Sequence, residues 1–333
     1  MINSRSTRKR KRKLRGFRVF LLLVFLVLLG GGAFYAFDIY THAKQVSAKI
    51  YQQLDSSKIK NHGNENVEVT KDPFNILLVG LDTQGGGRGR SDVLMLVTVN
   101  PKTKSLSALS IPRDTRMYLP EAGYKTKINS SYAYGGIEST INSVNRLLDV
   151  PIDYYITTNF QGFEDIVNTF DGVNVDVPFT FKSQLTESLK WKTFTKGPMY
   201  LNGNEALAYV RMRKHDPLGD HGRNIRQQQV IKAIIDKGTS FTSITKIDQV
   251  MENIGSNVKT NIPPSKFASF VALYASIKDA QVENLKLKGQ DAYINHGYYY
   301  IPDQESINQL HSTLLQQLGK DPNSTDTQSS MNN

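Results

Sequence analysis

Asn75-Ile-Leu-Leu-Val-Gly-Leu81 is a continuous apolar run of strand length, and Asp92-Val-Leu-Met-Leu-Val-Thr-Val99 is a second one. Unbroken apolar runs of this length are typical of strands that are covered on both faces. Asn100-Pro-Lys-Thr-Lys104 predicts a turn, after which residues 105–111 return as a third strand. These three segments predict the centre of a buried sheet.

Strands and helices mix along the rest of the domain without strict alternation. Apolar runs predict further strands at residues 153–158, 173–177, 282–287 and 292–301. A helical period predicts helices at residues 137–148, 160–170, 205–212, 224–237, 265–276 and 304–318. This mixture predicts an α/β fold, a three-layer α/β/α domain with a central mixed sheet.

The amino terminus predicts a membrane anchor ahead of this domain. Residues 1–18 carry nine of the basic residues and no acid, so they account for most of the formal charge of +11. Val19 to Phe37 follows, nineteen residues without a charge, whereas a membrane span needs about 20 apolar residues and a signal-peptide core about 7–15. The positive-inside rule places the amino terminus in the cytoplasm and the chain after one transmembrane helix outside. A cleaved signal peptide, with Gly31 and Ala33 near its end, is the alternative.

The resulting organisation has five parts: a basic cytoplasmic tail (1–18), a transmembrane helix (19–37), a stalk (38–71), an extracytoplasmic domain (72–319) and a disordered polar tail (320–333). The chain has no cysteine, which excludes disulfides, thiolate metal sites and a thiol nucleophile. That composition fits a bacterial surface protein. Because the excess positive charge lies beside the predicted span, it argues against a nucleic-acid partner.

Two carboxylates flank a glycine-rich loop at the mouth of the predicted sheet. Asp82 follows the first strand and Asp92 opens the second, while the loop at residues 83–91 would let backbone approach a ligand closely. The loop lacks the Gly-Lys-Ser/Thr ending of a P-loop. Paired carboxylates suit magnesium, which often takes one or two of them together with phosphate oxygens. The alternative is that Asp82 caps a turn and Asp92 pairs with Arg90.

Arginines gather at two other places. Arg113 and Asp114 end the third predicted strand at an edge of the same sheet. Further along, Arg211 and Arg213 are two residues apart, so an extended segment would point both to one side, and Arg223 and Arg226 share one face of a predicted helix start. The arginine fork binds phosphate oxygens bidentately, and a helix amino terminus adds free N–H groups. We interpret the second cluster as an anion site, with a solvated basic face as the alternative.

Short motifs follow one another in order across about residues 73–240. They are Gly80-Leu-Asp82, Gly89-Arg90-Ser91-Asp92, Ser110-Ile-Pro-Arg113-Asp114-Thr115, Lys127-Ile-Asn129 with Tyr132-Ala-Tyr134-Gly135-Gly136, Pro151-Ile-Asp153-Tyr154, Phe160-Gln-Gly162-Phe163, Gly172-Val-Asn-Val175-Asp-Val177-Pro178, Leu201-Asn-Gly203 through Tyr209-Val-Arg211-Met-Arg213, and Gly222-Arg223-Asn-Ile-Arg226-Gln-Gln-Gln229. In this order they resemble the LytR-CpsA-Psr (LCP) family of bacterial envelope proteins. The loop between Asp82 and Asp92 departs from the family in being short and rich in glycine.

The resemblance implies phosphotransfer at the cell membrane of a Gram-positive bacterium. An anionic glycopolymer, of the wall teichoic acid or capsule type, would move from an undecaprenyl-diphosphate carrier to an acetylmuramoyl hydroxyl of peptidoglycan, with pyrophosphatase activity as a further expectation. The resemblance also implies Mg²⁺, or Mn²⁺ in its place, bound by Asp82 and Asp92. The expected diphosphate ligands are Arg90, Arg113, Arg211, Arg213, Arg223, Arg226, Gln227 and Gln229, and the expected catalytic residues are Arg113, Asp114, Arg211 and Arg213.

Several points stay open at this level. Asp114 and Asp220 are both candidates for the group that takes the acceptor's proton, and His215 and His221 are expected to be bystanders. The apolar faces of residues 160–170 and 230–235 could line a tunnel for a prenyl chain or could pack as core. Two other functions remain as alternatives: a membrane-anchored module that binds lipid-linked phosphate without turnover, and an envelope-related transcriptional regulator. Residues 241–333 carry no motif that can be transferred.

Overall fold

The computed structural model describes residues 50–59, 63–64, 66–83, 89–186, 188–213, 216–238, 257–277, 280 and 282–321. The predicted cytoplasmic tail and transmembrane helix, the first part of the stalk, loop residues 84–88 and the tail after residue 321 lie outside these ranges. In the part of the chain that is described, no helix combines the length and the apolar content needed to cross a membrane.

A six-stranded mixed sheet lies at the centre of the domain. Its spatial order is β11 (Val258–Thr260), β6 (Tyr154–Thr158), β1 (Phe74–Leu81), β2 (Ser91–Asn100), β3 (Ser105–Ser110) and β12 (Val282–Lys286). β2 runs antiparallel to both β1 and β3, β6 runs parallel to β1, and β12 runs parallel to β3. The carboxyl ends of β1, β3, β6 and β12 and the start of β2 therefore meet at one edge, called the carboxyl edge below.

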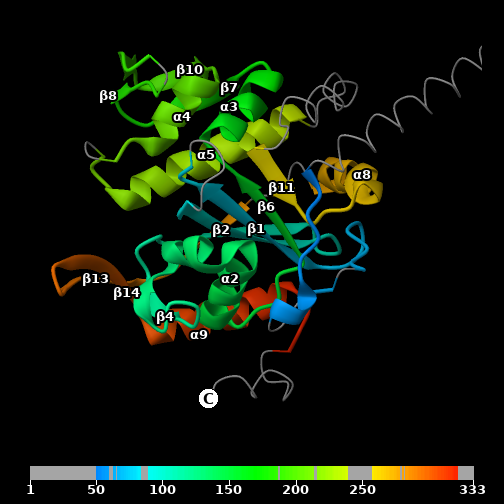
Figure 1. Cartoon of the computed structure of the whole chain (residues 1–333). Coiled ribbons are helices and arrows are strands. Elements are labelled where there is room, and N and C mark those ends of the chain that lie inside the picture. The colour runs from blue at the N-terminus through cyan, green and yellow to red at the C-terminus, as the bar shows by residue number, and fades with distance from the viewer. Residues whose placement is uncertain are drawn as a thin grey trace, which may run out of the picture.

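Helices cover both faces of this sheet, as Figure 1 shows. On one face, α2 (Ser131–Leu148) and α9 (Gln304–Gln317) pack over a cluster that includes Leu77, Val79 and Leu96. On the other face lie α8 (Phe267–Ile277) and α5 (Asp220–Gly238). There Phe74, Tyr154 and Phe270 pack edge to face, with ring centroids 5.6–5.8 Å apart. Both faces of β1 thus bury apolar side chains, which explains its unbroken apolar run and confirms the predicted mixed sheet between helical layers.

A second hydrophobic cluster lies beside the sheet and packs against α5. It is built from α3 (Phe160–Thr169), α4 (Gly203–Arg211), the pair β7 (Val173–Val177) and β10 (Gly197–Leu201), and the hairpin β8 (Phe181–Gln184) with β9 (Trp191–Phe194). Gly203 sets the spacing of two of these helices, because a Cβ there would lie 2.5 Å from the carbonyl oxygen of Glu164 on α3. The close approach of α3 and α4 therefore needs a glycine at this position.

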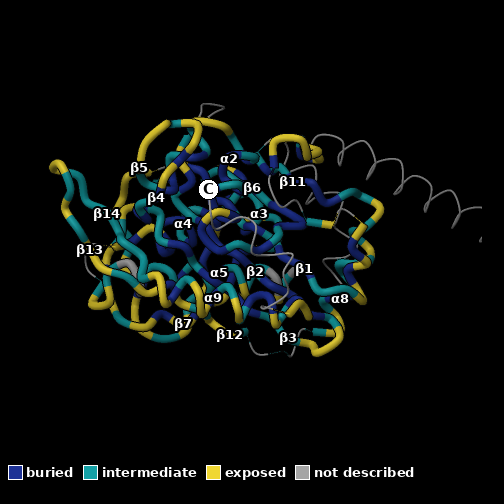
Figure 2. The backbone as a smooth tube through the Cα atoms, turned by 90° about the horizontal axis from the view of Figure 1, so that it is seen from below, coloured by how far each residue is buried: buried dark blue, intermediate teal, exposed yellow. Residues whose placement is uncertain are grey.

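Two small hairpins complete the described chain: β4 (Arg116–Leu119) with β5 (Tyr124–Lys127), and β13 (Gly289–Ile294) with β14 (Gly297–Pro302). The prediction of one strand over residues 292–301 is wrong, because a two-residue turn divides it. Asn295 and His296 form this turn with φ of 48° and 63°, the left-handed pair that a tight hairpin requires. The Asn-His pair lacks the glycine that usually marks such a turn. The β13–β14 hairpin projects from the body of the molecule (Figures 1 and 2).

The packed domain begins earlier than residue 72, where the sequence placed its start. Ile50, Leu54, Ile59, Val67 and Val69 are all buried, and Leu54 and Ile59 belong to the same cluster as the central strands. At least residues 50–59 and 66–71 of the predicted stalk are therefore part of the domain. Ser56, Ser57 and Lys58 lie between the buried Leu54 and Ile59 and are exposed.

Candidate functional site

The two carboxylates predicted to bind a metal lie at the carboxyl edge of the sheet. The amide of Asp82 donates to the carbonyl of Arg90 at 2.9 Å, which holds the end of β1 against the start of β2. Gly80 pairs with Val93 but Leu81 pairs with Ser91, so Asp92 is the extra residue of a β-bulge. A bulge re-aims the side chain it carries and is common beside active sites. Both residues lie at this edge of the sheet, as their positions at strand ends predicted, but the sequence could not show the bulge.

Asp92 belongs to a network of charged side chains. The Arg113 Nη1 lies 2.8 Å from the Asp92 carboxylate, and the Arg113 Nε lies 3.6 Å from the Asp114 carboxylate. The other Asp114 oxygen accepts from Lys127 Nζ at 2.6 Å, and Asn129 Nδ2 lies 3.5 Å from Asp92. Asp92 therefore pairs with Arg113, and the alternative in which it pairs with Arg90 is wrong. Lys127 and Asn129 were not among the predicted site residues, although both lie in a motif of the resemblance.

Asp114 lies at the centre of this network of charged side chains, between Arg113 and Lys127. The residue is 6% exposed, and each carboxylate oxygen faces one cation, Arg113 or Lys127. Two cations compensate the cost of burying this carboxylate, and in return Asp114 fixes the position of both. The geometry thus favours a positioning role for Asp114 over the catalytic role that the resemblance implied. The side chain of Asp220, the other candidate base, lies outside the description.

Arg211 reaches the same edge from a different element. It ends α4, its guanidinium lies 4.4 Å from the centroid of the Phe160 ring, and its Nη1 donates to Thr186 Oγ1 at 3.2 Å. Phe160 opens α3 directly after β6, whose last residue, Thr158, pairs with Gly80 of β1. Stacking and a neutral hydrogen bond hold Arg211 in place without neutralising its charge, so the guanidinium can still bind an anion.

Two further cations are exposed. Arg90 is exposed directly beside Asp82 and makes no ion pair with the described residues. Arg213 is also exposed. Arg211 is the last residue of α4, as the predicted helix over residues 205–212 implies, and the buried Met212 leaves the helix with φ −59° and ψ 131°. Arg211 and Arg213 therefore do not lie on one extended segment.

Arg226, a predicted diphosphate ligand, has a different place. It is 1% exposed, forms an ion pair with the equally buried carboxylate of Asp216, and donates to the carbonyls of Tyr209 and Met212. Gly222 makes room for this pair, since a Cβ there would lie 2.1–2.3 Å from the Asp216 carboxylate. All three guanidinium nitrogens are used by the protein. The diphosphate role predicted for Arg226 does not agree with this arrangement, in which the residue ties α5 to the end of α4.

The glutamines after Arg226 point in different directions. Gln228 Nε2 lies 3.5 Å from Ser110 Oγ at the end of β3, and so faces the carboxyl edge. Gln229 turns away, because its amide donates to the carbonyl of Asp176 at 2.8 Å and accepts from the Tyr209 hydroxyl at 2.7 Å. Burial raises the pKa of Tyr209 to about 12, which keeps that hydroxyl a donor. The structure therefore brings Gln228 to the edge, a residue the sequence did not single out, and not the predicted Gln229.

The remaining predicted residues lie at the start of α5. Arg223 and Gln227 are half-buried there. His215 and the side chain of His221 lie outside the description. The two apolar faces considered as a prenyl tunnel pack together in the second cluster through Phe163, Val167 and Val230, so in this structure they serve as core.

Comparison with known proteins identifies the chain. The LytR_cpsA_psr family matches residues 37–316. The chain belongs to the LytR_cpsA_psr family. It is 39% identical over 319 residues to the "Polyisoprenyl-teichoic acid–peptidoglycan teichoic acid transferase TagU" of Bacillus subtilis strain 168, covering 95% of this chain and 100% of TagU.

Solved LCP structures share the fold. The crystal structure of B. subtilis TagV is 41% identical, with a TM-score of 0.67, and the match covers 75% of this chain and 98% of TagV. A structure of TagT bound to LI-WTA is 35% identical, with a TM-score of 0.64, and the match covers 78% of this chain and 97% of TagT. The resemblance drawn from the ordered motifs is thereby confirmed.

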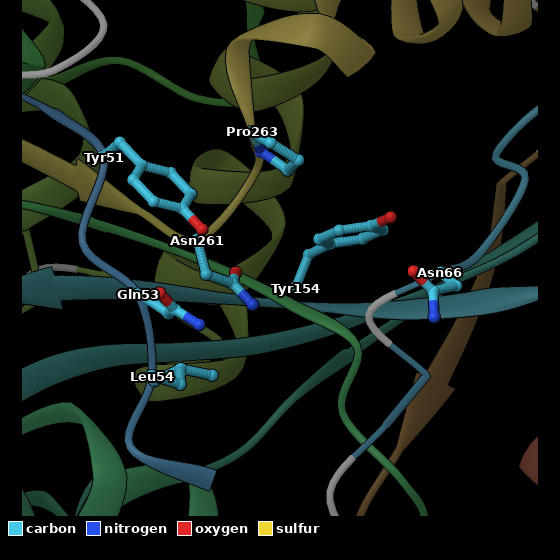
Figure 3. Close-up of a pocket in the computed structure, with 7 residues that line it drawn as sticks. All are labelled: Tyr51, Gln53, Leu54, Asn66, Tyr154, Asn261 and Pro263. Atoms are coloured by element: carbon cyan, nitrogen blue, oxygen red, sulfur yellow. The ribbon is translucent and has the colours of Figure 1, made fainter.

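A small pocket lies at the opposite end of β6 from the charged edge of this LCP domain. It has a volume of about 130 Å³ and is lined by Tyr51, Gln53, Leu54, Asn66, Tyr154, Asn261 and Pro263 (Figure 3). None of these side chains carries a charge at neutral pH, since burial raises the pKa of Tyr154 to about 12. A diphosphate needs cationic ligands, so this pocket is not the site of its binding.

The buried pair of Asp216 and Arg226 should be important for the stability of the LCP domain. Replacing Asp216 by alanine leaves a buried guanidinium without its partner, and we expect a loss of about 3–5 kcal/mol in the free energy of unfolding. Urea unfolding measures it. Lys232→Ala is the matched control on α5, the helix that carries Arg226, because the ion pair of Lys232 with Asp236 is exposed and should contribute about 1 kcal/mol or less. Similar losses for the two variants would mean that the buried pair does not form.

Proposed function

We propose that this LCP protein is a phosphotransferase that moves a teichoic-acid-type glycopolymer from a polyprenyl-diphosphate carrier to peptidoglycan. The names of its relatives support the transferred polymer and the acceptor. The observation that carries the proposal is Arg113, held between Asp92 and Asp114 at the carboxyl edge that Arg90 and Arg211 reach from other elements. Cations from separate elements at one edge suit a diphosphate, which is heavily anionic.

In the proposed reaction, the acceptor hydroxyl oxygen bonds to the phosphorus that carries the polymer. The bond from that phosphorus to the bridging oxygen breaks, polyprenyl monophosphate leaves with the electron pair, and the hydroxyl proton passes to a base. Phosphoryl transfer depends mainly on positioning and on stabilising charge as it develops. Arg113 and Arg211 would supply both, because each is already fixed by protein contacts before the substrate arrives. Water attacking in place of the hydroxyl would give pyrophosphatase activity.

Magnesium fits the carboxylates present at this edge. It often takes one or two carboxylates and completes its shell with water and substrate phosphates, and Asp82 and Asp92 supply that number. When bound, Mg²⁺ or Mn²⁺ would offset negative charge on the diphosphate. The Asp82 carboxylate is exposed and makes no ion pair with the described residues, which leaves it available. Asp92 would share its carboxylate between the metal and Arg113.

The direct test is a transfer assay with the purified full-length protein. It needs a polyprenyl-diphosphate-linked polymer, peptidoglycan glycan strands and magnesium. The proposal expects the polymer to be joined to the glycan and polyprenyl monophosphate to be released. A module that only binds lipid-linked phosphate would retain the donor without release, and that result would replace the transferase by the alternative function.

We expect the amino terminus to lie in the cytoplasm, the predicted membrane anchor to be retained, and the domain to lie on the outer face of the cell membrane. Nine basic residues before a nineteen-residue uncharged span favour this orientation. Protease added to intact protoplasts should digest the chain after residue 40 and spare residues 1–18. A mature protein that starts near Phe34 and is released into the medium would contradict the anchor.

A further inference from the structure

The β13–β14 hairpin presents aromatic side chains to solvent in a fixed arrangement. Tyr293 is 80% exposed, and its ring packs edge to face against Tyr298 with centroids 5.7 Å apart. The Tyr298 hydroxyl donates to Asp291 Oδ1 at 2.7 Å. The hairpin projects from the body of the molecule (Figures 1 and 2), so these rings are held by one another and do not fill a core. Ordered and exposed aromatic side chains are typical of binding surfaces.

The hairpin is joined directly to the charged site. The amide of Tyr300 donates to the carbonyl of Asp114 at 2.9 Å, and Tyr300 forms a parallel bridge with Thr115. Lys127 Nζ lies 5.7–5.8 Å from the ring centroids of Tyr298 and Tyr299, while it also contacts Asp114 at 2.6 Å. Lys127 therefore contacts both the network of charged side chains that includes Asp92 and the tyrosine rings of the hairpin.

The neighbouring β4–β5 hairpin meets the other face of β14 and supports it. Arg116 lies 5.7 Å from the centroid of the Tyr299 ring, so the face of β4 that carries Arg116 meets β14. Tyr118 lies two residues further along and therefore on the same face, opposite Lys125 of β5. Tyr118 is 44% exposed. Tyr299 lies on the opposite face of the hairpin from Tyr293 and Tyr298, which pair directly across the two strands. We call Tyr293 and Tyr298, the two rings that share the outer face, the tyrosine strip.

We propose that the tyrosine strip binds the acceptor glycan, the chain of N-acetylated amino sugars in peptidoglycan. Pyranose rings present faces of C–H groups, and these are attracted to the negative face of an aromatic ring. The tyrosine hydroxyls can bond sugar hydroxyl and acetamido groups, and Arg116 and Lys125 match the carboxylates of muramoyl and peptide substituents. The inference rests on the proposed function, since an acceptor held on the strip would lead into the site where the diphosphate is expected.

The chemistry of the hairpin favours a glycan over a membrane surface. Anionic lipid headgroups attract clusters of lysine and arginine, yet residues 289–302 contain neither and include the acidic Asp291. The turn residues Asn295 and His296 are polar and exposed, so the turn itself carries no large apolar side chain for insertion into a bilayer. A flat, hydrogen-bonding sugar chain, whose carboxylates are carried by its substituents and not by its rings, fits this composition better.

The test measures binding of soluble peptidoglycan glycan strands, freed of teichoic acid, to the full-length protein by isothermal titration calorimetry without donor. Tyr293→Ala/Tyr298→Ala should weaken glycan affinity at least about tenfold, the loss of two ring contacts. Tyr293→Phe, which keeps the ring, should bind within about twofold of the unchanged protein. Trp191→Ala is the matched control, because Trp191 is an exposed aromatic residue of the separate β8–β9 hairpin.

Three results would distinguish glycan binding by the tyrosine strip from its alternatives. Unchanged glycan affinity in the double variant, or an equal loss in Trp191→Ala, would overturn the inference. So would a loss of binding to vesicles of anionic lipid with glycan affinity intact, which would indicate a membrane contact. If the unchanged protein transfers no polymer but the double variant still loses glycan affinity, the strip stands and the transferase fails. In the transfer assay, the strip predicts a higher KM for glycan with donor affinity unchanged.

Discussion

Replacing Arg113 by lysine is expected to lower the transfer rate by about 100-fold, while donor affinity falls only modestly. Lysine keeps the charge but loses the planar fork, and removal of one stabilising donor commonly costs about 10²–10³ in turnover. Arg113 is well placed for this role, because its Nη1 donates to Asp92 at 2.8 Å and its Nε lies 3.6 Å from the Asp114 carboxylate. Transfer rate and lipid-diphosphate affinity should be measured on the same preparations.

The comparison with other arginines makes this result interpretable. Arg211→Lys should behave in the same way, since it also loses its stacking over Phe160. Arg146→Lys is the matched control, because Arg146 is an exposed arginine near the end of α2. Equal losses in affinity and rate for Arg113→Lys would indicate uniform binding of substrate and transition state. The arginine would then have no special part in the reaction.

Asp82→Asn is expected to abolish the magnesium dependence of transfer and to reduce activity by about 100-fold or more. A magnesium site with one carboxylate removed binds its ion poorly. Asp82 isolates this effect better than Asp92, since Asp92 also pairs with Arg113 and its loss would disturb both. The free energy of unfolding should change by less than about 1 kcal/mol, because Asp82 is exposed.

Two measurements check this prediction. Titration of the protein with Mn²⁺, followed by its magnetic resonance signal, reports metal binding without any turnover. Asp72→Asn, just before the other end of β1, is the control and should leave both metal binding and transfer intact. A large loss of stability in Asp82→Asn together with unchanged metal binding would assign Asp82 to a capping role and remove the metal from this edge.

The sequence predicted those parts of the fold in which the apolar pattern of a segment alone shows that the segment is buried. The runs at residues 76–81 and 93–97 contain no polar side chain because both faces of β1 and β2 are covered, and no long-range information is needed to recognise them. The β13–β14 turn is a different case. Its left-handed residues are Asn295 and His296, so the break in the strand depends on backbone conformation that these residue types only weakly specify.

The sequence predicted which segments meet at the site, but it did not predict which side chains of those segments face it. Motif spacing placed Asp82, Asp92 and Arg113 at one edge, since strand ends follow from the strands. Spacing could not separate Gln228 from Gln229, because each step along a helix turns the side chain by about 100°. Nor could it show that Arg226 has a buried partner in Asp216, which lies ten residues earlier in an irregular segment.

The burial of Ile50 limits how far the domain can travel. A stalk reaching from residue 38 to residue 71 would be a leash of up to about 120 Å at full extension, from roughly 3.5 Å per residue. Because Ile50 is buried, no more than residues 38–49 separate the predicted span from the packed domain, which sets an upper limit of about 40 Å on that separation whatever their conformation. With the anchor retained, the first packed residue works within that radius of the lipid. If the proposed anchor and lipid-linked donor are correct, the donor would lie within that distance of the domain, and the acceptor strands in range would be those in the wall layer nearest the cell.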